Sequence, residues 1–199
     1  MKKSFAILMF LVPVIVVIFS ACHFSSPQKV SVNTDGAAYG KLSEYHFFKE
    51  DIKQLVPNDK VLLYSMITSL FSDYAYKQKF LWMPEGQSAT YSKDETLEFP
   101  TGTVLINTLY YPVDFRNEKK GRRLIETQLL IKKKTKWDAL TYVWNNEQTD
   151  AELAIAGDTK HTEWTDMNGA KRSVSFNISN KNQCKNCHSY NNELVPVGT

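Results

Sequence analysis

Three long stretches between residues 103 and 145 are rich in β-branched and aromatic residues with a period of two, which is the period of an extended strand. In Trp137–Asn145 both faces are apolar, because Trp137, Ala139 and Val143 alternate with Leu140, Tyr142 and Trp144. Such a strand has to be covered on both sides, as strands are in the layers of a β-sandwich. The ranges that we predict to be strands are Val61–Ser65, Thr103–Tyr111, Arg122–Lys133, Trp137–Asn145 and Ser173–Ile178.

The region before these strands has a helical pattern. Apolar residues recur at helical spacing in Lys41–Val56, and Pro57 ends the pattern. Turn residues separate the predicted strands, for example Pro84–Gly86 and Asn168–Gly169. The sequence therefore predicts a mainly β fold for residues 41–179, namely an antiparallel β-sandwich-like domain with a short N-terminal helix.

The N-terminus has the pattern of an export signal. Lys2 and Lys3 precede an apolar run from Phe5 to Phe19, which is shorter than the ~20 residues that a membrane-spanning helix needs. The stretch Phe19–Cys22 ends in small residues and a cysteine, like a bacterial lipoprotein cleavage box. We interpret residues 1–21 as a signal peptide, Cys22 as the lipidated residue and residues 22–40 as a flexible tether. The alternative is ordinary secretory cleavage, with Cys22 incidental.

The sequence CKNCH at residues 184–188 is the motif that most strongly indicates a function. Two cysteines three positions apart, followed directly by a histidine, have the spacing of a c-type haem attachment site. Cys184 and Cys187 would form the two thioether bonds, and His188 would be the proximal iron ligand. One helical turn places both thiols on the same side, so we predict a short helix in Asn180–His188.

Other readings of the motif remain open. A zinc site needs four ligands, and His161 could join Cys184, Cys187 and His188. A redox dithiol normally lies in a βαβ unit, which this region lacks. The total of three cysteines favours haem, since one lipidated cysteine and two haem cysteines leave none over.

The distal iron ligand cannot be assigned from the sequence. The candidates upstream of the motif are His46, Met66, Met83, His161 and Met167, and we retain Met167 and His161 as weak candidates. We expect an open sixth position, with weak peroxidase activity as a consequence, because polar loops surround these residues.

A further pattern is a set of short phrases in one order: Leu70–Ala75 (LFSDYA), Phe99–Ile106 (FPTGTVLI), Arg123–Thr127 (RLIET), Tyr142–Asn145 (YVWN), Glu147–Ala151 (EQTDA) and Asn182–His188 (NQCKNCH). In these phrases, from about Lys41 to His188, the chain resembles a family of lipoprotein-like bacterial di-haem c-type cytochromes. The resemblance implies a longer cytochrome region with a second CxxCH after the first. This chain has one CxxCH, so we expect residues 180–199 to be a haem attachment segment that begins a truncated cytochrome region.

Together these features predict an exported, lipid-anchored c-type cytochrome with one haem c, an electron carrier more than an enzyme. Its expected partners are the membrane, on the periplasmic face, and an unidentified redox protein. The net charge is only +3, and the sequence shows no basic helix that could enter a groove of a nucleic acid. We therefore expect no nucleic-acid partner. The rival interpretation is a non-catalytic β-rich interaction lipoprotein of the periplasm, with a remnant haem motif.

Overall fold

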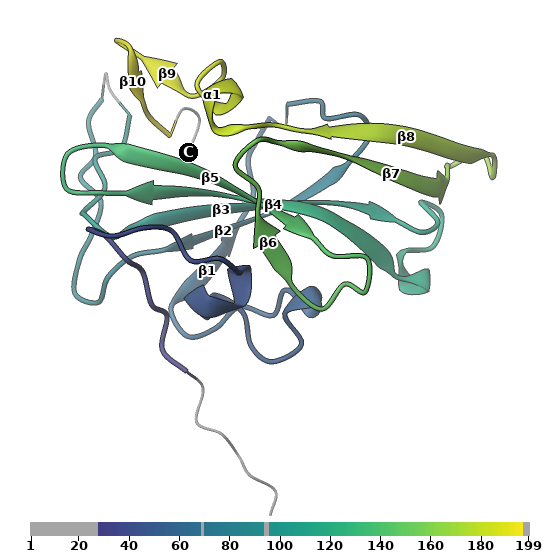
Figure 1. The fold of residues 1–199 in the computed structure, drawn as a ribbon, viewed down its shortest axis with the longest axis horizontal. Helices are drawn as coiled ribbons and strands as arrows, with labels where there is room; N and C mark the ends of the chain where they lie inside the picture. The colour runs from purple at the N-terminus through teal and green to yellow at the C-terminus, as the bar shows by residue number, and fades with distance from the viewer. Residues whose placement is uncertain (1–27, 69, 94–95, 197–199) are drawn as a thin grey trace, which may run out of the picture.

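The computed structural model describes residues 28–68, 70–93 and 96–196; the predicted signal peptide and Cys22 lie outside these residues. A six-stranded antiparallel sheet forms the centre, and each strand pairs with the next one along the chain (Figure 1). The strands are β1 (Val61–Tyr64), β2 (Tyr76–Trp82), β3 (Val104–Pro112), β4 (Arg122–Lys132), β5 (Trp137–Trp144) and β6 (Ala151–Leu153).

The two faces of the sheet are covered by different parts of the chain (Figure 1). Two 3-10 helices before the first strand, η1 (Leu42–Tyr45) and η2 (Ile52–Gln54), lie on one side. A third, η3 (Glu118–Lys120), lies in the β3–β4 connection. On the other side lie a hairpin of β7 (Asp158–Thr165) and β8 (Lys171–Ile178), then α1 (Lys181–Cys184) and a small hairpin of β9 (Ser189–Tyr190) and β10 (Glu193–Leu194).

The face toward η1 and η2 carries the largest core cluster. Its members come from the N-terminal segment and from alternate positions of the sheet, among them Leu42, Phe47, Phe80, Ile106 and Leu129. Polar atoms buried in this core are paired. The Tyr142 hydroxyl donates to the Tyr39 carbonyl at 2.9 Å and lies 2.9 Å from the Tyr45 hydroxyl, while Trp144 Nε1 donates to Thr127 at 3.0 Å. The tyrosine contacts attach the N-terminal segment to β5.

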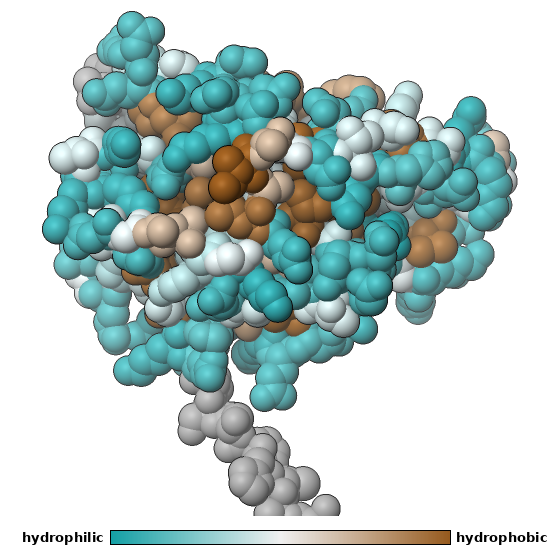
Figure 2. Space-filling model, in the orientation of Figure 1, coloured by the Kyte–Doolittle hydropathy of each residue, from teal (hydrophilic) through white to brown (hydrophobic). Residues whose placement is uncertain are grey.

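The opposite face is only partly covered by the β7–β8 hairpin. Trp164 of β7 stacks on Tyr111 of β3, with ring centroids 4.7 Å apart, and Phe176 and Ile178 of β8 belong to the same cluster. Figure 2 shows apolar areas near the middle of one view of the molecule, within a mostly hydrophilic surface.

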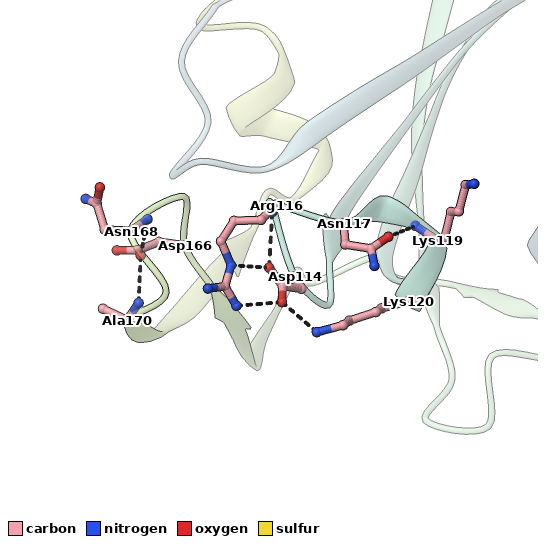
Figure 3. A network of polar contacts seen from close by, with 8 residues as sticks. All are labelled: Asp114, Arg116, Asn117, Lys119, Lys120, Asp166, Asn168 and Ala170. Carbon is pink, nitrogen blue, oxygen red and sulfur yellow. Dashed lines mark hydrogen bonds and ion pairs between the residues drawn. The ribbon is translucent and has the colours of Figure 1, made fainter.

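A buried carboxylate orders the β3–β4 connection where it meets one end of this hairpin (Figure 3). Asp114 accepts hydrogen bonds from Arg116, through the backbone N–H, Nε and Nη2, and from Lys120 Nζ at 2.8 Å. These cations hold the pKa of Asp114 well below its usual range. Beside it the backbone of β7 joins the same loop, because Phe115 donates to the Thr165 carbonyl at 2.9 Å and Thr165 donates to Val113 at 3.0 Å.

The carboxylate of Asp166 closes the turn of the hairpin. Its Oδ1 accepts from the backbone N–H of Asn168 and of Ala170, each at 2.9 Å, and its Oδ2 accepts from Arg172 at 2.8 Å (Figure 3). The hairpin is joined to the β3–β4 connection through the backbone of Thr165, and the part of the sheet face toward β9 and β10 is left for other residues to cover.

The predicted mainly β, antiparallel fold is confirmed. Each predicted strand has a counterpart, but β2, β6, β7, β9 and β10 were not predicted. Where a short N-terminal helix was predicted within Lys41–Val56, the structure has the 3-10 helices η1 and η2, because His46, Asp51 and Leu55 adopt positive φ and interrupt the helical turns. The second layer is a two-stranded hairpin beside a six-stranded sheet. No helix among the described residues has the length and apolarity needed to cross a bilayer.

Candidate haem site

A groove of about 370 Å³ lies between the sheet and the C-terminal segment, on the face that the β7–β8 hairpin leaves open. This volume is within the range of small-molecule and cofactor sites. Both motif cysteines and His188 line it, together with residues of β2 to β5 and of the loop after β1. The apolar part of its lining includes Leu105, Leu109, Leu130 and Ala139. The CKNCH segment therefore faces a hollow in the sheet.

The floor of the groove is crossed by a row of polar residues. The strand register pairs Tyr64 with Lys79, Lys79 with Asn107, Asn107 with Gln128, and Gln128 with Thr141. Directly opposed residues of antiparallel strands point to the same face, so these five side chains lie in one line across β1 to β5. The neighbouring row on one side is apolar, with Leu105, Leu130 and Ala139, and the row on the other side holds Lys77 and Glu126 beside Leu109. Polar groups placed beside apolar ones in this way are typical of a binding site.

The polar row continues into a buried carboxyl group. Asn107 donates to Gln128 Oε1 at 3.0 Å, and Gln128 donates to Glu126 Oε1 at 2.7 Å. Glu126 is only 1% exposed, and its Oε2 has no hydrogen-bond partner among the described residues; Asn107 Oδ1 is likewise buried and unpaired there. Burial raises the pKa of Glu126 to about 7, against the opposing hydrogen bond from Gln128.

The motif segment is attached to β5. Thr141 donates to the Ser179 carbonyl at 3.3 Å, and Lys181 forms an ion pair with Asp138. Asn180 caps α1, since its side chain accepts from the N–H groups of Asn182 and Gln183 at 3.0 and 3.1 Å. These contacts start the short helix at a defined place beside the groove.

The two cysteines lie one helical turn apart. The backbone N–H groups of Cys187 and His188 both donate to the Cys184 carbonyl, at 3.4 and 3.1 Å. Cys184 is half-buried and Cys187 exposed, and neither is in a disulfide. Burial, and then the carboxyl group of Glu126, raise the pKa of the Cys184 thiol. Both thiols are thus free and lie at the rim of one groove, as attachment to one macrocycle requires.

His188 is oriented by the chain that follows it. Its Nδ1 lies 3.3 Å from the Val195 carbonyl, and the Val195 N–H donates to the His188 carbonyl at 2.9 Å. With the proton on Nδ1, the lone pair of Nε2 is left for a metal, which is the arrangement that metal-binding histidines commonly show. Burial, helped by the charge of Lys79, lowers the pKa of His188, so the ring is neutral at neutral pH as a ligand must be.

The structure shows which candidates for the distal ligand lie away from the groove. His161 lies on β7, where it pairs with Glu163 at 3.6 Å, and Met167 lies 65% exposed after β7; neither lines the groove. His46 follows η1 on the opposite face of the sheet, and Met83 packs beside Phe99 and Trp137.

Met66, in the loop after β1, lines the groove with His188. It is the only one of the five candidates among the described groove-lining residues. A zinc site with His161 as the fourth ligand is not supported, because His161 lies outside the groove. In the described ranges, no three His, Cys, Asp or Glu side chains are grouped as a metal site.

The sequence analysis did not identify the polar residues of the groove floor as part of a site. Lys77 and Lys79 alternate with Gln78 and Phe80 in the stretch YKQKFLW, a period-two pattern that identifies β2. Glu126, Thr127 and Gln128 stand between two apolar parts of β4, Leu124–Ile125 and Leu129–Ile131, which is the signal of a buried polar group. These two observations could have located the polar floor.

Comparisons with known proteins found no match to this chain among family models, curated proteins or solved structures. The resemblance to di-haem cytochromes therefore stays a prediction.

The first testable prediction concerns Glu126. Its pKa is raised from 4.5 to about 7, so the unfolded chain releases this proton at lower pH than the folded one. Ionisation of Glu126 should then reduce the free energy of unfolding by about 3 kcal/mol between about pH 4.5 and 7.5. In the chain without haem, the variant Glu126→Gln should lack this loss, which urea denaturation across that range measures.

The comparison with wild type isolates Glu126 from other titrating groups. His188 has a lowered pKa and gives the opposite slope below about pH 6.5, but it is present in both proteins. Glu147→Gln is the control, since Glu147 is exposed, and it should follow the wild-type curve. Equal pH dependence in wild type and Glu126→Gln would show that the carboxyl is not held in the buried position.

Proposed function

We propose that this protein is an exported, lipid-anchored c-type cytochrome that carries one haem c and exchanges electrons with a redox protein. Cys184 and Cys187 hold the haem, and His188 binds its iron. The observation that carries the proposal is the pair of groove-facing cysteines beside a histidine whose Nδ1 is bonded to the Val195 carbonyl. A chance CxxCH in a surface loop has no reason to lie in a groove with an oriented, half-buried histidine.

When bound, the haem supplies reversible one-electron transfer. The contribution of the chain is to position and enclose it. The Val195 carbonyl orients the imidazole of His188, and the contacts of Thr141 and Lys181 fix the cysteine segment on β5. The apolar residues of the floor would exclude water from one side of it, and Asn107 and Gln128, which Glu126 holds through a hydrogen bond to Gln128, would place hydrogen-bonding groups beside it. The residues present therefore fit a haem.

The direct test is covalent haem attachment. We expect the protein, co-expressed with a cytochrome-maturation system and denatured, to give a haem-stained band on a gel. Cys184→Ala/Cys187→Ala should abolish the band, because both thioethers are lost, and Cys187→Ala should leave at most one thioether.

His188→Ala should lose the proximal ligand and change the visible spectrum, whereas His161→Ala, outside the groove, should match the wild type. If the wild type showed no covalent haem, the cytochrome proposal would be wrong, and the rival proposal of a β-rich interaction lipoprotein with a remnant motif would stand.

The sixth iron position is proposed to be open. Met66 is the one methionine among the described residues that line the groove, and it lies in a loop next to the fully exposed Ile67. Such a loop gives no packed support for an axial ligand. The reduced protein should bind carbon monoxide and show weak peroxidase activity, and Met66→Leu and Met167→Leu should leave both unchanged. A wild type that resists carbon monoxide, together with a Met66→Leu variant that binds it, would show that Met66 closes the position.

The lipid anchor is a separate proposal that rests on the signal pattern before Cys22. It places the protein on the periplasmic face of a membrane, where c-type haem is attached. The mature protein should begin at Cys22 and partition into the detergent phase, because two or more acyl chains hold a protein stably on a bilayer. Cys22→Ser should block processing or release the protein. A wild type that is wholly in the aqueous phase after export would contradict the anchor.

A further inference from the structure

Two lysines of β2 point into the groove. Lys77 and Lys79 are two positions apart on one strand, so their side chains lie on the same face. The register places Lys79 opposite Asn107 and Lys77 opposite Leu109, and all four residues line the groove. Both lysines are half-buried, and burial lowers the pKa of each; the charge of Lys77 lowers the pKa of Lys79 further.

No carboxylate neutralises this pair within the described residues. Neither lysine takes part in the ion pairs found there, and the Nζ of Lys77 donates to a backbone carbonyl, that of Leu70. Glu126 shares a row with Lys77, but Leu109 lies between them, so their strands are about 10 Å apart. Two adjacent, partly desolvated cations without a counter-charge are costly unless a ligand supplies one.

The position of the lysines relative to the cysteines suggests which ligand this is. The cysteine segment is attached to β5, and the lysines are on β2, three strand spacings or about 14 Å away across the floor. Haem c is an elongated, apolar plate with the thioether-bearing positions on one half and two propionate carboxylates on the other. A ring attached at Cys184 and Cys187 and lying over the floor directs its propionates toward β2.

We propose that Lys77 and Lys79 form the propionate site of this groove, each ammonium neutralising one carboxylate of the haem. The assignment rests on the proposed function and adds to it the orientation of the ring, with the propionates toward β2 and the cysteines over β5. It also explains two charged side chains in a groove whose other described lining residues, His188 aside, are neutral or apolar.

The test separates propionate recognition from general haem binding. In the full chain with Cys184→Ala/Cys187→Ala, added haemin binds without covalent attachment, and its affinity can be measured by optical titration. Haemin dimethyl ester, in which both carboxylates are neutral, is the second probe. Adding Lys77→Gln/Lys79→Gln should weaken haemin binding at least tenfold and leave binding of the ester unchanged.

Lys49→Gln/Lys171→Gln is the matched control, because both lysines are exposed and the change in net charge is the same. It should bind both probes like the parent, and circular dichroism should show each variant folded. If the lysine variant loses affinity equally for haemin and the ester, or for neither, the propionate assignment is wrong while the haem proposal stands. If the parent binds neither probe, both are wrong.

Discussion

The elements that pack on the two faces of the central sheet determine where a binding site can form. Strands β4 and β5 carry apolar side chains on both faces, so both sides have to be shielded from water. The N-terminal 3-10 helices shield one face completely enough for Phe80 and Ile106 to be fully buried. On the other face the β7–β8 hairpin, joined through the backbone of Thr165 to the β3–β4 connection, covers one end only. The remaining part is the groove, and its cover is the CKNCH segment.

The partial cover on this second face explains why polar residues are tolerated in the sheet. Tyr64, Lys79, Asn107, Gln128 and Thr141 form one cross-strand row on the face that carries the groove, and the CKNCH segment and the loop after β1 line the same groove. Buried acceptors that stay unpaired and lysines that stay unneutralised reduce the stability of a fold. Conflicts of this kind between local chemistry and stability are expected at functional sites. A carboxylate-bearing, largely apolar cofactor removes part of the conflict.

The sequence predicts the fold where the period-two pattern is strong and fails where it is mixed. Thr103–Tyr111 and Arg122–Lys133 were located because their apolar faces repeat over many residues. Strand β2 was missed because lysines occupy one of its faces, and these lysines also belong to the proposed site. The motif residues were found from spacing alone. The environment of the motif could not be predicted from the spacing. The contact of His188 with Val195 depends on a reversal of the chain, and the polar row across β1 to β5 depends on the strand register.

The central claim is that the haem of Cys184 and Cys187 lies in this groove, between His188 and the polar row. The most direct measurement is a crystal structure of the haem-loaded protein. The account predicts the ring over β3 and β4, with His188 on its iron, Asn107 and Gln128 on the floor beneath, and the propionates next to Lys77 and Lys79. A haem that projects into solvent from the exposed side of Cys187, with the groove filled by protein side chains, would contradict it.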